Sequence, residues 1–107
     1  MSDPTPIHRG LWSTVIEYII DFPGFVVCEF YDLHGTLHQV LEKVPVLTRI
    51  EIDETSILPM RLTIPGIILE QAWVNGQLSV RFGIAQPYAI ASTAGLTEFW
   101  VLATQVE

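Results

Sequence analysis

The feature that most constrains the fold is the stretch 64–84, IPGIILEQAWVNGQLSVRFGI, which has the pattern of a β-hairpin. Asn75 and Gly76 stand between two runs rich in β-forming residues, and both accept the positive φ angles of a type I′ turn. A two-residue turn fixes how the two strands pair. The expected opposite pairs are Val74–Gln77, Trp73–Leu78, Gln71–Val80, Glu70–Arg81 and Leu69–Phe82.

This register gives the hairpin two different faces, because successive side chains of a strand point to opposite sides. One face is apolar except for Gln71, and the other is the polar, solvated face. On the polar face Glu70 stands opposite Arg81, so we expect an exposed cross-strand ion pair. Such a pair stabilises by only about 0.2–1 kcal/mol, and it helps to define the register more than the stability. The apolar face consists of Ile67, Leu69, Trp73, Leu78, Val80, Phe82 and Ile84.

The rest of the chain has similar β patterns separated by turn residues. Pro23-Gly24 and Pro65-Gly66 each match the centre of a type II turn. A second hairpin is expected around Asp32–Gly35, closed by a glycine bulge, with Phe30 opposite His38. One helical turn is expected at 53–56. Further strands are predicted at 11–20, 25–32, 36–43, 44–52 and 96–104, with short extended segments at 60–64 and 88–91.

No run of helical periodicity is present, so the chain is predicted to be all-β. Six or seven short strands in 107 residues favour a small antiparallel barrel, with a two-sheet sandwich as the alternative. The length allows one hydrophobic core. We therefore expect a single domain over residues 11–107. Residues 1–10, which include Pro4 and Pro6, are expected to form a loose N-terminal leader.

Hydrophobic residues make up 50% of the chain and charged residues only 16%. The usual charged share is about 25%, so a small domain of this composition has little charge with which to cover its surface. Contiguous exposed apolar area usually marks an interface. The alternative is a well-filled core with apolar residues scattered singly over the surface.

The charge balance excludes some partners. Twelve acidic and five basic residues give a net charge of −7, and the basic residues form no cluster, which argues against nucleic-acid binding. The single cysteine, Cys28, excludes an internal disulfide and fits a reducing compartment. The sequence shows no signal peptide and no apolar run of the roughly 18 residues that a membrane helix needs. We expect a cytoplasmic protein without membrane contact.

Two histidines are weak candidates for metal binding. His34 and His38 lie four residues apart, with Glu29, Asp32 or Glu42 as possible oxygen ligands. A zinc site needs three or four convergent ligands, so we favour structural roles for both histidines and expect no cofactor.

Cys28 would be a nucleophile only if a nearby base stabilised its thiolate. Its apolar neighbours Val26, Val27 and Phe30 instead indicate a buried structural thiol. No catalytic spacing is recognisable elsewhere in the chain.

The sequence therefore favours a non-catalytic protein-interaction module that self-associates or caps a partner protein, for example as an acidic inhibitor or immunity-type protein. One alternative is a small barrel whose aromatic residues enclose an apolar ligand. Another is an enzyme that uses His34, His38 or Cys28. For the interaction module we predict an interface that contains Leu69, Trp73, Phe82 and Trp100.

Overall fold

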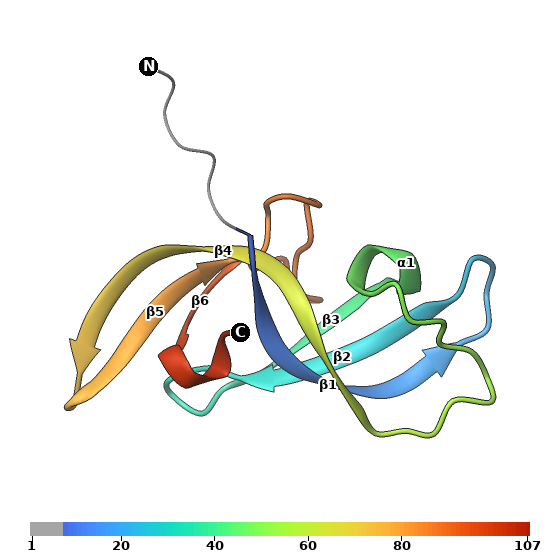
Figure 1. Ribbon diagram of the computed structural model, residues 1–107, viewed down its shortest axis with the longest axis horizontal. Helices are drawn as coiled ribbons and strands as arrows, with labels where there is room; N and C mark the ends of the chain where they lie inside the picture. The colour runs from blue at the N-terminus through green and yellow to red at the C-terminus, as the bar shows by residue number, and fades with distance from the viewer. Residues whose placement is uncertain (1–7) are drawn as a thin grey trace, which may run out of the picture.

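In the computed structural model, which describes residues 8–107, six antiparallel strands form one strongly curled sheet (Figure 1). The order of the strands across the sheet is β3-β2-β1-β4-β5-β6. The all-β prediction is confirmed, and the sheet is a half-barrel. The strands are β1 (Arg9–Ile19), β2 (Phe25–Tyr31), β3 (Leu37–Lys43), β4 (Met60–Val74), β5 (Gln77–Gly83) and β6 (Glu98–Leu102).

The sheet curls because β4 changes its pairing partner along its length. Residues 60–66 of β4 pair with β1, and residues 67–74 pair with β5. At the passage between the two halves lies Gly66, which approaches the backbone of Gly83 and the ring of Phe82 so closely that a Cβ atom would overlap both. The curl brings the inner side chains of all the strands together in one core. The largest fully buried side chains are Phe82, Leu11, Ile64, Ile84, Ile90, Val15, Val26, Val40, Val80 and Val101.

Hydrogen bonds join the β2–β3 hairpin to β6 and to the loop that precedes β6. The amide of Leu33 donates to the carbonyl of Trp100 (2.7 Å), and the amide of Thr93 donates to the carbonyl of Gln39 (2.8 Å). Inside the sheet, the rings of Phe30 and Phe99 meet edge to face with centroids 5.0 Å apart. These contacts fix the curvature of the half-barrel.

The predicted register of the β4–β5 hairpin is confirmed from its turn as far as Glu70. Asn75 and Gly76 have φ angles of 51° and 78°, and Trp73 pairs with Leu78 and Glu70 with Arg81. Beyond Glu70 the prediction was wrong. A β-bulge at Leu69 shifts the register, so that Phe82 stands opposite Ile68. Bulges bend a strand and increase its twist, which suits the point where β4 leaves the core.

The β2–β3 hairpin agrees with its prediction over its whole length. Phe30 pairs with His38 and Cys28 with Val40. Gly35 has a φ of 79° and donates its amide to the carbonyl of Asp32. A turn is also present near Pro23-Gly24, but its hydrogen bond runs from the amide of Gly24 to the carbonyl of Asp21. Phe22 and Pro23 therefore take its central positions, instead of Pro23 and Gly24 as predicted, and Gly24 follows with a φ of 98°.

The predicted turn at Pro65-Gly66 was wrong, since both residues lie inside β4. At this point β4 changes from pairing with β1 to pairing with β5. A strand with a neighbour on only one side tolerates proline, because the missing amide hydrogen is not needed there.

The predicted strand at 44–52 was also wrong. Val44–Leu47 form the short helix α1, which buries Val44 and Leu47, and the chain then continues without regular structure. Pro45 in the first turn of α1 suits a helix start, where its amide hydrogen would lack an intrahelical partner.

Four further assignments differ from the prediction. The segment 88–91 lies in a loop, and the last strand ends at Leu102, where the short 3₁₀ helix η1 (Ala103–Gln105) begins. The segment 53–56 forms a hydrogen-bonded turn from Ser56 to Asp53. Of the predicted leader, residues 1–7 lie outside the described residues, and Arg9 and Gly10 already belong to β1.

Candidate interaction surface

The end of the β4–β5 hairpin projects beyond the core of the half-barrel (Figure 1). We call residues 71–78 the hairpin tip. Trp73 and Leu78 face each other across the tip, and their exposed fractions are 73% and 38%. Two and four residues further along the same side of β5, Val80 and Phe82 are buried. The apolar face of the hairpin is therefore covered at its root and uncovered at its tip.

The four predicted interface residues do not form one patch. Trp73 lies on the core-facing side of the tip, whereas Leu69 lies on the outer side, where it covers Gly83. Trp100 is half-buried in β6 opposite Arg81 on the outer side. Phe82 is completely buried in the core, so it cannot contact a partner in this structure. Trp73 is the predicted residue that is most available to a partner.

The outer side of the hairpin contains an ion-pair cluster of one arginine and two glutamates. The predicted pair is present, with Nε of Arg81 3.3 Å from Oε1 of Glu70. Nη1 of Arg81 also donates to the carboxylate of Glu98, a contact from the next strand that the hairpin pattern alone did not predict. The hydrogen bond with Glu98, together with Glu70, raises the pKa of Arg81 above its ordinary value.

The two candidate metal-binding histidines do not converge. Nε2 of His38 lies 2.8 Å from Oδ2 of Asp32, and its ring packs against Phe30 and Phe99. His34 lies in the turn, where its backbone amide donates to Oδ1 of Asp32. Within residues 8–107 no three His, Cys, Asp or Glu side chains are grouped so that they could hold a metal ion. The arrangement orders the turn of the β2–β3 hairpin.

Asp32 is the centre of this turn. Its carboxylate accepts hydrogen bonds from the amides of His34 and Thr36 at 2.8 and 3.0 Å, and it also contacts His38. Partial burial acts to raise the pKa of Asp32, but the hydrogen bonds from His38, Thr36 and His34 together hold it below its ordinary value. The ionised carboxylate therefore stabilises the turn.

Cys28 is completely buried between the strands. Burial raises the pKa of its thiol to about 11, although a hydrogen bond with Ser13 acts in the opposite direction. At neutral pH the thiol is protonated, which makes it a poor nucleophile. These observations agree with a structural role for Cys28.

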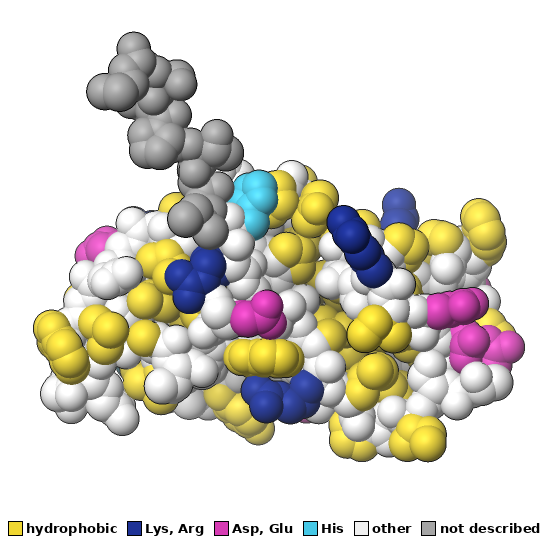
Figure 2. Space-filling model, in the orientation of Figure 1, with side chains coloured by type: hydrophobic (Ala, Val, Ile, Leu, Met, Phe, Trp, Pro, Cys, Tyr) yellow, Lys and Arg dark blue, Asp and Glu magenta, His cyan; other side chains and the backbone are white. Residues whose placement is uncertain are grey.

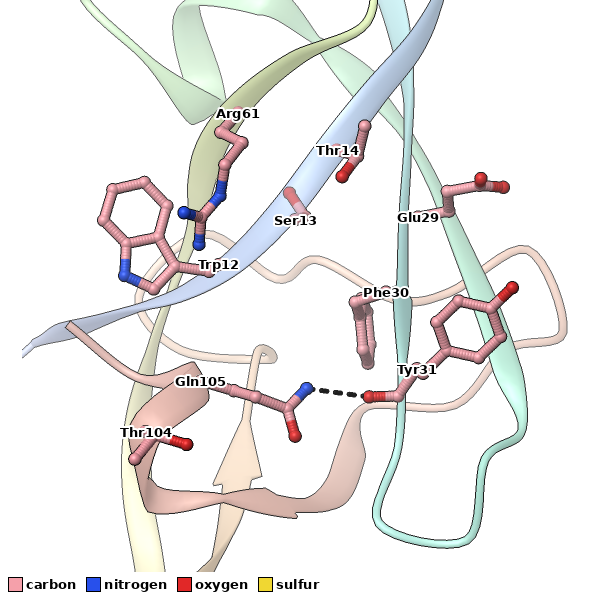
Figure 3. A pocket seen from close by; sticks show the side chains of 9 residues that line it. All are labelled: Trp12, Ser13, Thr14, Glu29, Phe30, Tyr31, Arg61, Thr104 and Gln105. Atoms are coloured by element: carbon pink, nitrogen blue, oxygen red, sulfur yellow. Dashed lines mark hydrogen bonds between the residues drawn. The ribbon is translucent and has the colours of Figure 1, made fainter.

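An open groove of about 320 Å³ lies beside β1, β2 and η1 (Figure 3). On one side the guanidinium of Arg61 stands 4.5 Å from the centre of the Trp12 ring. On the other side the Gln105 side chain donates to the carbonyl of Tyr31. The groove is open to solvent, so Trp12 and Tyr31 line it without enclosing a cavity. The remaining lining residues are Ser13, Thr14, Glu29, Phe30 and Thr104.

A second apolar surface lies at the opposite end of the molecule, where the β1–β2 turn meets the loop 48–59. We call this region the acidic end. Phe22 and Ile57 are 98% and 89% exposed, and Ile20 and Ile50 are also exposed. Figure 2 shows acidic and apolar side chains together at this end. The acidic residues of this part of the chain are Glu17, Asp21, Glu51, Asp53 and Glu54.

Sequence reasoning did not identify the acidic end as a surface. Its residues come from two segments about 30 positions apart in the sequence. Open grooves line this end, formed by Tyr18, Asp53 and their neighbours from both segments. Only the three acidic residues between Ile50 and Ile57 gave a sign of an apolar and acidic surface in the sequence.

Neither of the two short helices within residues 8–107 is long and apolar enough to cross a membrane. Comparison of the chain with protein-family models gives no match, and comparisons with curated proteins and with solved structures find no similar protein. The candidate surfaces therefore rest on the geometry and chemistry of this chain alone.

Proposed function

We propose that the protein is a non-catalytic interaction module that self-associates through its hairpin tip. The observation that carries this proposal is the exposure of Trp73 beside Leu78, on the apolar face of a hairpin that extends past the core. Tryptophan is among the residues that most often dominate the binding energy of protein interfaces. A large aromatic side chain left uncovered in the isolated chain is accounted for when a second protein surface covers it.

Charge supports self-association at this end. Residues 67–84 contain one glutamate and one arginine, and Glu98 of β6 contacts the same arginine, so the local net charge is only −1, whereas the whole chain has a net charge of −7. Two copies of an acidic protein repel each other least where their local charge is compensated. The hairpin is such a region.

Solution mass measured by light scattering over a range of concentrations tests the proposal. We expect a dimer or larger species that Trp73→Glu weakens by at least about tenfold, because the substitution places a charge at a desolvated contact. Phe22→Glu is the matched control, since it makes the same kind of change at an exposed aromatic residue of the acidic end. Circular dichroism of both variants checks that they are folded. A wild-type protein that remains monomeric at high concentration contradicts the proposal.

A second candidate function is capping of a basic partner by the acidic end. The observation in its favour is that four exposed apolar side chains and five acidic residues share this end, which matches a partner surface of cationic and apolar groups. Affinity capture from the protein's own source, compared between Phe22→Ser and Trp73→Ser variants, tests it. Loss of a salt-sensitive partner only in Phe22→Ser supports capping, and equal capture by both variants contradicts it.

We further infer a cytoplasmic location. The support is the single cysteine, which is buried as a free thiol and needs no oxidising compartment. Fractionation of cells that produce the protein from its own gene tests this inference, and recovery from an extracytoplasmic fraction would contradict it.

A further inference from the structure

Within residues 8–107, the projecting half of β4 pairs on one side only. Residues 67–74 pair with β5, while β1 pairs only with residues 60–66. In the part of the chain that the structure describes, no strand pairs with residues 67–74 on the side away from β5. We call this side of residues 67–74 the free edge. Figure 1 shows it as the outer border of the projecting hairpin.

The free edge lacks most of the features that protect exposed strand edges. Its sequence, IILEQAWV, contains one charged residue, Glu70, and neither lysine nor proline. Lysine, proline, bulges and short length are the usual ways in which proteins prevent a strand edge from pairing with another chain. The bulge at Leu69 protects the root of the hairpin, so residues 70–74 remain as a regular and unprotected edge.

The hairpin turn determines which backbone groups face outward. Val74 and Gln77 flank the two-residue turn and form the hydrogen-bonded pair that closes it. Such pairs alternate along an antiparallel ladder, so Ala72 and Glu70 also bond to β5. The amide and carbonyl groups of Gln71 and Trp73 therefore point towards the free edge.

We propose that two copies of the chain pair their free edges antiparallel, with Ala72 of each copy on the two-fold axis, so that the two sheets join into one. This inference rests on the proposed self-association and specifies its geometry. In this register Trp73 bonds to Gln71 of the partner subunit, and by symmetry Gln71 bonds to Trp73 of the partner subunit. The outward amides and carbonyls of both copies are then all paired.

The sequence of the edge selects this register over its neighbours. If the pairing of the two edges shifted by one residue, core-facing side chains of one copy would stand opposite outer side chains of the other, because side chains alternate along each strand. A two-fold axis at Glu70 would place two carboxylates directly opposite each other, which is destabilising. An axis at Gln71 would place the bulged Leu69 opposite Trp73 of the partner subunit, on the wrong side of the sheet. A two-fold axis at Trp73 would lie so close to the hairpin turn that only a few residues of each edge could pair.

The proposed register also explains the exposed tryptophan. Trp73 stands diagonally from Trp73 of the partner subunit on the core-facing side of the joined sheet. Diagonal neighbours in a sheet are about 7–8 Å apart, within the reach of aromatic side chains. The two indole rings and the two Leu78 side chains then cover one another. At the axis itself, the small side chain of Ala72 allows the close approach of two strands.

Cysteine cross-linking under mild oxidation tests the register. Ala72→Cys is expected to give a disulfide-linked dimer, since opposite residues that are not hydrogen-bonded have Cα atoms about 4.5 Å apart, within disulfide range. Glu70→Cys and Val74→Cys are the matched controls. Each alone is expected to remain uncross-linked, because the two copies of Val74 would lie about 14 Å apart along the strands. A mixture of the two controls is expected to give the mixed dimer. Cys28 does not interfere, because it is completely buried.

A backbone variant separates edge pairing from the wider proposal. Gln71→Pro removes an outward amide hydrogen and leaves the hydrogen bonds to β5 in place, because proline is tolerated where the amide faces away from the ladder. We expect the dimer to weaken at least about tenfold through loss of one hydrogen bond from each copy. Gln71→Ser, which keeps the amide, is expected to dimerise like the wild type.

The outcomes distinguish the two proposals. A dimer that withstands Gln71→Pro and gives no cross-link through Ala72→Cys overturns edge pairing but leaves self-association standing. A wild-type protein that is monomeric at all concentrations overturns both. If Gln71→Pro fails to fold, the three cysteine variants still decide the register.

Discussion

The β2–β3 and β4–β5 hairpins of the half-barrel both have tight turns, but in the described part of the chain one turn is hydrogen-bonded to the rest of the molecule and the other is not. The turn of the β2–β3 hairpin is held from several sides, since Leu33 bonds to Trp100 and Gln105 bonds to Tyr31. Within residues 8–107 no hydrogen bond joins the turn of the β4–β5 hairpin to any element outside that hairpin. One hairpin is thus anchored at its turn, and the other is anchored only at its root.

The difference shows that local turn residues define the register of a hairpin but do not determine whether its turn packs against the rest of the molecule. Asn75-Gly76 and Asp32–Gly35 each specify a register through nearby residues. Whether the turn is then covered depends on the direction that the curled sheet gives to the strands, and this direction depends on contacts between distant residues such as Gly66 and Phe82. Among residues 8–107, the hairpin with the uncovered turn is the one whose apolar side chains Trp73 and Leu78 are exposed and whose β4 strand pairs on one side only.

The largest expected effect tests the division of the β4–β5 hairpin into a buried root and an uncovered tip. Phe82→Ala should lower the free energy of unfolding by about 3–5 kcal/mol, because it leaves a cavity in the core. Trp73→Ala should change it by less than about 0.5 kcal/mol under conditions where the chain is monomeric. Urea denaturation at low protein concentration measures both values. Similar losses in the two variants would show that the tip is not separate from the core.

The parts of the fold that the sequence predicted depend on residues close together in the chain. The register near Asn75-Gly76, the whole β2–β3 pairing and the Glu70–Arg81 ion pair all follow from a turn and from alternation. For the site, Trp73 is exposed in the structure and lies next to a turn, and its place in an interface stays a prediction. The burial of Phe82 was not predicted, because Phe82 and Trp73 lie on the same face of the hairpin. Only the position of the core distinguishes the two residues.

The features that the sequence did not predict depend on the curl of the sheet. The bulge at Leu69 and the passage of β4 through Pro65-Gly66 arise where one strand has to leave β1 and join β5. Local propensity favours a turn at Pro-Gly, and only tertiary pairing overrides it. The helix α1 is four residues long, which is too short to show a helical period.

A second prediction tests the passage between the two halves of β4. In Gly66→Ala the new Cβ would lie 2.5 Å from Cε1 of Phe82 and closer still to the carbonyl oxygen of Gly83. Because a backbone atom cannot move aside easily, we expect a loss of about 3 kcal/mol in the free energy of unfolding. Gly76→Ala at the tip meets no atom within 4 Å, and only its positive φ opposes alanine. Its expected loss is about 1 kcal/mol.

Thermal or urea denaturation of these two glycine variants gives the comparison directly. An equal loss in both would show that the close approach of β4 to β5 at Gly66 relaxes at little cost. The projecting hairpin would then be free to change its angle to the core, and its free edge would have no fixed direction.

The smallest expected effect concerns the anchored turn and depends on pH. The pKa of Asp32 is lowered in the folded protein, so its ionised form stabilises the fold above the ordinary carboxyl pKa near 3.8. This contribution is lost as the pH falls through the lower, folded value. Asp32→Asn keeps an oxygen acceptor for the amides of His34 and Thr36 but loses the charge. We therefore expect it to be less stable than the wild type by about 1 kcal/mol at pH 7, a difference that shrinks below pH 4.

Asp32→Ala serves as the reference for this measurement, because it removes the acceptors as well as the charge and should destabilise the protein at every pH. Urea denaturation between pH 7 and about pH 2.5 checks the three proteins together. If the difference between the wild type and Asp32→Asn is the same throughout this range, the charge of Asp32 contributes nothing. The β2–β3 turn would then be held by its contacts with β6 and η1, and the contrast between the two hairpins would lie wholly in those tertiary contacts.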